Sequence, residues 1–139
     1  MAKNEKLYLT KQQRLVSVTL TNSDGTTPKE LVAGGADDSI IKALFITSDD
    51  STARDVLLFH RSGSTNYNLG HVDVPVGSGT DGSTSMVNGL NATNLPALPT
   101  DAQGNRYIPV QYGASIYVGM LTTVTSGKTV TVTAVVEDF

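Results

Sequence analysis

The abundance of valine and threonine, together with the alternation of apolar and polar residues, constrains the fold of this chain more than any other feature. The 139 residues include 18 Thr, 15 Val and 12 Ser, against three Phe and no Trp. β-Branched side chains are restricted at χ1 and pack well on pleated sheets, so they favour strands over helices. Within residues 14–21, for example, Val16, Val18 and Leu20 alternate with hydroxyl side chains, which is the period of a half-buried strand. The sequence therefore predicts an all-β protein.

The same pattern continues along the chain and predicts seven or eight short strands. They cover residues 14–21, 30–33, 40–46, 56–59, 67–76, 106–111, 114–121 and 128–136. The runs 40–46 and 56–59 are apolar on both faces, as expected in the middle of a sandwich or at a subunit contact. We expect the last two strands to form a hairpin through residues 125–127.

Strand spacing and the remaining segments predict the architecture. Strands separated by turn residues every 8–12 positions favour an antiparallel β-sandwich, jelly-roll-like, and no segment could serve as a crossover helix for a parallel sheet. A short helical turn is expected at residues 85–91, where Met86, Val87 and Leu90 would form one small apolar face. We expect an extended N-terminal arm over residues 1–13 and one sandwich domain over residues 14–139.

Charge and composition exclude several classes of function. Ten basic and thirteen acidic residues give a net charge of −3, which leaves no basic face for nucleic acid. No apolar run approaches the ~20 residues of a membrane span, and none follows the N-terminus as in a secretory signal. The absence of cysteine excludes thiolate metal sites and cysteine nucleophiles. We expect a protein made in the cytoplasm that binds neither nucleic acid nor membranes.

Two sets of residues are candidates for metal binding. His60 and His71, completed by Asp73, could form a metal pair, although a structural or surface role is favoured because two histidines are few. Asp49, Asp50 and Asp55 flank a Ser/Thr loop, but their spacing does not match a calcium-binding loop. A solvated turn, with aspartates accepting hydrogen bonds from nearby amides, is favoured for them.

No motif predicts catalysis or a cofactor. Residues 77–82 (GSGTDG) match the glycine spacing of a dinucleotide-binding loop, but no long helix follows to bind a pyrophosphate. The chain has no Gly-x-Ser-x-Gly nucleophile motif and no carboxylate pair beside an aromatic sugar platform. We therefore predict a non-enzymatic protein without catalytic residues, metal or cofactor.

Several stretches of the C-terminal hundred residues carry a family resemblance: residues 41–48 and 54–58, then 90–99 with 104–109, and finally 125–130. In these stretches and in its general layout, the chain resembles the auxiliary capsid proteins of tailed bacteriophages, known as decoration or cement proteins. The resemblance implies a virion protein, made in the bacterial host cytoplasm, that binds the major capsid protein on the capsid surface. It implies a role in stabilising contacts between capsomers and supplies no site residues.

The N-terminal segment is basic, although the rest of the chain is acidic. Lys3, Lys6, Lys11 and Arg14 stand there against a single acid, Glu5. These four basic residues are candidates for docking on an acidic capsid groove, with main-chain pairing as a further source of affinity. The alternative is a solubilising tail.

The two doubly apolar runs also bear on oligomeric state. Part of their surface could be covered by a neighbouring copy, and small proteins of this kind commonly form closed rings, so we expect a homotrimer. Alternatively, both faces are covered within one sandwich.

Two other classes of protein would share this composition and fold. The first is a structural component of a phage tail, fibre or baseplate. The second is a carbohydrate-binding β-sandwich module, which the absence of Trp and the presence of only five Tyr disfavour.

Overall fold

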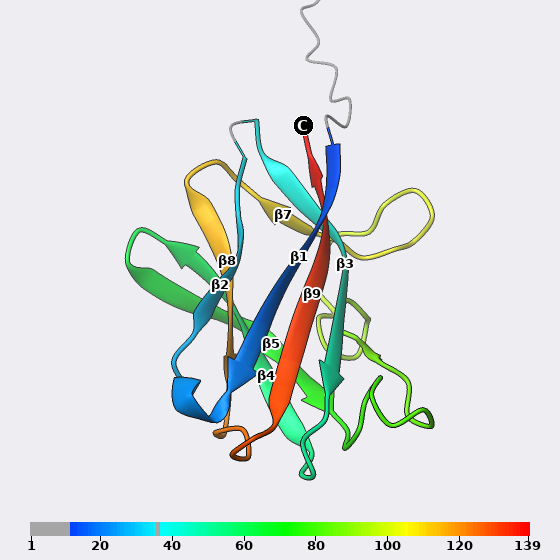
Figure 1. The fold of residues 1–139 in the computed structure, drawn as a ribbon. Coiled ribbons are helices and arrows are strands. Elements are labelled where there is room, and N and C mark those ends of the chain that lie inside the picture. Colours follow the sequence, from blue (N-terminus) through cyan, green and yellow to red (C-terminus); the bar gives the residue numbers. More distant parts are fainter. Residues whose placement is uncertain (1–11, 36) are drawn as a thin grey trace, which may run out of the picture.

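Two antiparallel sheets face each other in the computed structural model, which describes residues 12–35 and 37–139 (Figure 1). Sheet A contains β1 (Gln12–Thr21), β9 (Thr129–Asp138), β3 (Ser39–Ser48) and the short strands β6 (Val87–Asn88) and β7 (Ile108–Val110). Sheet B contains β2 (Lys29–Ala33), β8 (Ala114–Met120), β4 (Arg54–Ser62) and β5 (Thr65–Val74), in that order. This arrangement confirms the predicted antiparallel β-sandwich.

The strands pair in a nested order. β1 pairs with β9, β2 with β8, and β4 with β5, while β6 and β7 both pair with β3. The residues of β3 that pair with β6 and β7 also pair with β9. The two short strands therefore lie along one edge of β3, and β9 lies along the other. The first strand therefore pairs with the last, and the nesting continues inward to the central β4–β5 hairpin.

The prediction of a hairpin between the last two strands is wrong. β8 lies in sheet B and β9 in sheet A. The predicted turn does form, with the Lys128 N–H donating to Thr125 O at 3.0 Å, but it carries the chain from one sheet to the other. Alternation along a strand defines its two faces and not its partner, so adjacent strands with matching patterns need not pair.

The prediction of a helical turn at residues 85–91 is also wrong. Val87 and Asn88 are extended and pair with β3. The carboxamide of Asn88 accepts a hydrogen bond from the Leu90 N–H at 3.0 Å, and that of Asn91 accepts two more from the following backbone. Such local bonds compete with helix formation. Within the described ranges, the one helical segment is a 3₁₀ turn, η1 (Asn22–Asp24), where the sequence predicts a turn.

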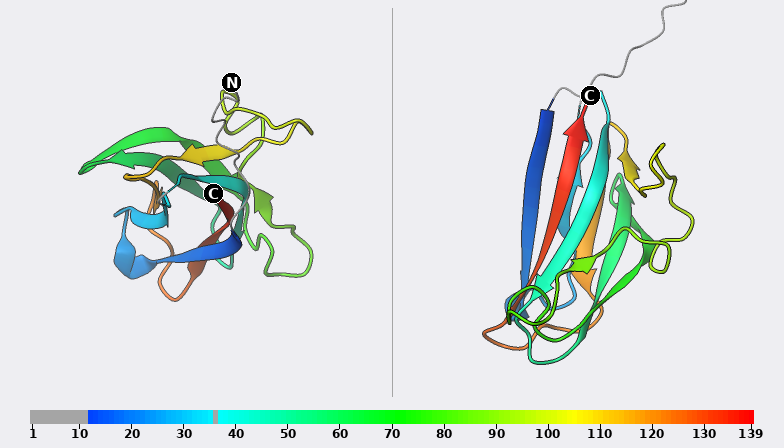
Figure 2. Two further views of the ribbon diagram at one scale, coloured as in Figure 1. Left: turned by 90° about the horizontal axis from the view of Figure 1, so that it is seen from above. Right: turned by 90° about the vertical axis from the view of Figure 1, so that its right-hand side faces the viewer.

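The two sheets form two layers (Figure 2), and the buried hydrophobic residues of both form one core. Inward residues of the two apolar runs, such as Ile41, Ile46 and Leu58, are buried, and Phe45 and Phe59 lie half-buried outside the core.

β1 begins at Gln12, so residues 12 and 13 of the expected arm pair with β9, and residues 1–11 lie outside the described part of the chain. None of the described segments is a helix long and apolar enough to cross a membrane.

Candidate functional site

The two histidines do not meet. His60 lies opposite Tyr67, with ring centroids 6.2 Å apart, and shares the inward face of β4 with Leu58. His71 lies opposite Leu57, on the outward face of the same sheet. Its Nε2 is 3.6 Å from Asp73 Oδ1. In the described part of the chain, no three His, Asp or Glu side chains form a metal-binding group.

The three aspartates considered for calcium have separate partners. Asp49 accepts the Thr129 N–H at 2.7 Å, and Asp55 lies across from Asp73. Asp50 is completely buried. Its carboxylate accepts hydrogen bonds from Arg54 Nε at 2.8 Å and from the hydroxyl and N–H of Thr125 at 2.7 and 3.0 Å. The aspartates therefore do not converge on a cation site.

The environment of Asp50 makes it a structural anchor. Burial acts to raise the pKa of Asp50, but hydrogen bonds from Thr125, Arg54 and Thr52 outweigh it and hold the pKa well below its usual range. Arg54 also donates to the Thr122 hydroxyl at 3.0 Å and to the Thr125 hydroxyl at 2.9 Å. These hydrogen bonds link the β3–β4 connection to the β8–β9 connection. The prediction of a solvated turn is wrong for Asp50, because the second connection covers it.

The glycine-rich segment 77–82 forms a loop of consecutive turns and bends. Gly77, Gly79 and Gly82 have φ values of 72°, 71° and 76°. The Asp81 carboxylate occupies the space beside Gly77, within 2.4 Å of where a Cβ would stand. It also accepts the N–H groups of Ser83 and Thr84 at 2.8 and 2.6 Å. A carboxylate in this position leaves no cradle for a phosphate.

Of the predicted capsid-binding residues, the described part of the chain includes only Arg14. Its Nε donates to Asp138 Oδ2 at 2.8 Å, and this bond lowers the pKa of Asp138. The charge of Arg14 is thus engaged in joining β1 to β9. Lys3, Lys6 and Lys11 lie outside the described residues.

The outer surface of sheet A carries a flat, uncharged area, which we call the sheet A face. Cross-strand register places three rows of outward side chains across β1, β9 and β3. Two hydroxyl pairs link the first two strands, Ser17–Thr133 at 2.9 Å and Thr19–Thr131 at 3.5 Å. The side chain of Leu15 is 70% exposed. The rows are Leu15–Val135–Ala43, Ser17–Thr133–Phe45 and Thr19–Thr131–Thr47.

The outer surface of sheet B is different. Asp55, Asp73 and His71 lie together on it. The Arg61 guanidinium lies over the Tyr117 ring, 4.6 Å from its centroid. The uncharged sheet A face therefore differs chemically from the outer surface of sheet B, which carries charged side chains.

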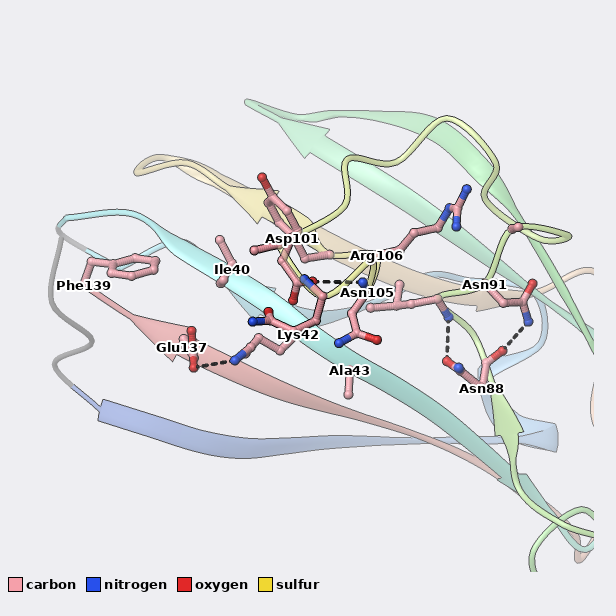
Figure 3. Close-up of a pocket in the computed structure, with 16 residues that line it drawn as sticks. Ile40, Lys42, Ala43, Asn88, Asn91, Asp101, Asn105, Arg106, Glu137 and Phe139 are labelled. Atoms are coloured by element: carbon pink, nitrogen blue, oxygen red, sulfur yellow. Dashed lines mark hydrogen bonds and ion pairs between the residues drawn. The ribbon is translucent and has the colours of Figure 1, made fainter.

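A polar groove of about 990 Å³ lies beside the sheet A face, where the segment 88–107 passes over β3. Figure 3 shows Phe139 at one end of the groove, Asn88 and Asn91 at the other, and Asp101 and Asn105 from the overlying loop between them. Lys42 Nζ is 3.2 Å from Glu137 Oε1 along one side. Sequence analysis missed this groove because its walls come from segments far apart in the chain.

Comparisons with known proteins do not assign this chain to a family. The sequence matches no protein-family profile and no curated protein. The fold is similar to a solved structure described as "Cyanophage Pam1 capsid asymmetric unit", with a TM-score of 0.48 and 12% identity over 100% of this chain and 94% of the other. At that identity and TM-score, the similarity establishes no common function.

Proposed function

We propose that this chain is a non-enzymatic structural protein of a tailed-phage particle, a decoration protein that binds the outside of the capsid shell and stabilises contacts between capsomers. The family resemblance of the sequence suggests this role. The sheet A face is the observation in the structure that carries it, since it is free of charged side chains, as the centres of protein interfaces tend to be.

The chemistry of the sheet A face suits a protein partner. Its nine residues, from Leu15 on β1 to Thr47 on β3, include no charged side chain. Centres of protein interfaces are depleted in charge, because burying an unpaired charge is costly. Thr and Val have few rotamers, so ordering them at an interface costs little entropy. The pair Lys42–Glu137 lies at one end of the face, where it would form part of a polar rim.

The location of the protein is tested by a density gradient of purified particles from its source. A fixed ratio to the main shell protein in full heads supports the proposal. Sedimentation with isolated tails or fibres would assign the chain to those structures instead. Recovery only in the unassembled fraction would contradict a virion role.

The docking surface is tested by a matched pair of substitutions. Leu15→Glu places a charge at an exposed corner of the sheet A face, where Leu15 is 70% exposed. Leu69→Glu places a charge on β5 of the other sheet, where Leu69 is 38% exposed. We expect L15E to weaken binding to shells lacking the protein by about tenfold or more, and L69E to leave it unchanged. Equal effects of the two variants would exclude the sheet A face as the contact.

The same proposal includes a trimer. Light scattering at micromolar concentration should give about 44 kDa, three times the 14.6 kDa of one chain. A mass near 15 kDa would contradict the trimer for the free protein while leaving shell binding open to the gradient experiment.

The basic N-terminal segment is the second proposed contact. Lys3, Lys6 and Lys11 would bind an acidic groove of the shell, whereas Arg14 is engaged with Asp138. Deleting residues 1–11 should therefore lower the affinity for shells and make the remaining binding less sensitive to salt. Unchanged affinity would favour the solubilising-tail alternative.

A further inference from the structure

The polar groove over β3 borders the sheet A face, with Ala43 in common, and we propose that it binds a neutral oligosaccharide. Its volume of about 990 Å³ lies at the upper end of the range for small-ligand sites. The inference depends on three properties of the groove: its charge balance, its free carboxamides and its rigid wall.

The side-chain charges that line the groove balance. Lys42 pairs with Glu137 at 3.2 Å, and the remaining side-chain charges are those of Asp101 and Arg106. Asp101 directs its carboxylate into its own turn, where Oδ1 accepts the N–H groups of Gln103 and Asn105, both at 2.9 Å. A nucleic acid or phosphate needs a cationic surface, so this groove favours an uncharged ligand.

Carboxamides supply most of the other polar groups. Four of them line the groove, from Asn88, Asn91, Gln103 and Asn105. In the part of the chain that the structure describes, the carboxamides of Gln103 and Asn105 have no hydrogen-bond partner. Each carboxamide both donates and accepts, which matches the hydroxyl groups of a sugar, since these also do both. Tyr107 and Phe139 add aromatic rings against which the apolar face of a sugar can pack.

The wall that carries the free carboxamides is held in place before any ligand binds. The Asp101 N–H donates to Asn105 O at 2.9 Å, the Gly104 N–H donates to Asp101 O at 3.0 Å, and Thr100 bridges to Arg106. At the far end, the Asn91 carboxamide bonds Asn88 O and the N–H groups of Thr93 and Asn94. A wall fixed in this way loses little entropy on binding.

An extended peptide suits the groove less well than a sugar. Strand addition needs unpaired backbone at a sheet edge. Here β3 already pairs with β7 over residues 39–41 and with β6 over residues 45–46. Between them, Leu44 O accepts the Gly89 N–H at 2.8 Å. The edge of β3 is therefore already paired at these positions and offers little backbone for strand addition.

The test is an NMR titration of the full chain with maltohexaose, cellohexaose, laminarihexaose and chitohexaose, each at millimolar concentration. We expect at least one to bind saturably and shift the side-chain amide signals of Gln103 and Asn105. The double substitution Gln103→Ala, Asn105→Ala should weaken that binding by about tenfold, the effect of losing one or two hydrogen bonds. Gln111→Ala is the matched control, an exposed carboxamide on another turn, and should change nothing.

Three results would overturn the proposal: no shift with any of the four sugars, equal binding by the double variant, or binding of a sulfated hexasaccharide alone. Unchanged backbone spectra of each variant show that its fold is intact. Because the experiment uses the isolated protein, its failure would leave the proposed capsid role untouched, and failure of the capsid role would not affect the groove.

Discussion

Single residues of this protein have roles that depend on what covers them, and Asp50 is the clearest case. It belongs to a polar run, residues 48–52, that is typical of a surface loop. The β8–β9 connection covers it, so the carboxylate is buried and bound by Arg54 and Thr125. A buried ion of this kind is stable only while its partners remain in place.

Asp50→Asn should therefore destabilise the fold by about 2–3 kcal/mol at neutral pH, because it removes the charge that pairs with Arg54 and accepts hydrogen bonds from Thr125. The pKa of Asp50 is lowered in the folded state, so its contribution to stability is complete above the unfolded pKa near 3.8 and is lost as pH falls below it. Urea unfolding at pH 7 and pH 3 measures this. The difference in free energy of unfolding between the wild type and D50N should be smaller at pH 3 than at pH 7. An equal difference at both values would contradict the ionic role of Asp50.

At the scale of elements, pairing between strands brings together residues that the sequence separates. The β4–β5 hairpin places Asp55 directly opposite Asp73. Hydrogen bonding to Asp73, burial and repulsion between the two carboxylates raise the pKa of Asp55, and His71 offsets this only in part. Two like charges opposite each other weaken a sheet.

Asp55→Asn should raise stability at pH 7 by about 0.5 kcal/mol, since it removes this repulsion. An acid with a raised folded pKa contributes stability at low pH, which is lost as pH rises through that pKa. The advantage of D55N should therefore shrink at pH 3, where the Asp55 carboxyl group is protonated and no longer repels Asp73. Thermal unfolding of D55N and of Asp73→Asn at both values measures this, and an equal gain at pH 3 would point to a cause other than repulsion.

At the scale of the whole molecule, the nested order of strands determines which parts are best protected. β9 pairs along its length with both β1 and β3, whereas β5 is an edge strand that pairs with β4 alone. The same order sets β1, β9 and β3 side by side, and it thereby creates the sheet A face (Figure 1).

Hydrogen exchange should follow this order. Amides of β9 have partners on both sides and should exchange most slowly, while alternate amides of β5 face away from β4 and should exchange faster. Exchange monitored residue by residue by NMR measures the difference. Protection of the outer β5 amides in the free protein would contradict an open edge and indicate pairing with another copy.

The sequence by itself determined which side of the alternating strands faces the core. Val16, Val18 and Leu20 point inward and the hydroxyl residues of β1 point outward, as their alternation predicts, because side-chain direction in a strand has a strict local period of two. Turn residues likewise located the ends of the longer strands to within a few positions.

Only the tertiary structure decided which strands pair, and with that the surfaces of the molecule. The hairpin expected between β8 and β9 is wrong, the extended backbone at Val87 replaces an expected helical turn, and Asp50 is buried. The sheet A face and the polar groove follow from the same pairing, since their residues are distant in the chain. Alternation is a local property, whereas pairing depends on how two sheets close around one core, and that choice is made by the whole chain.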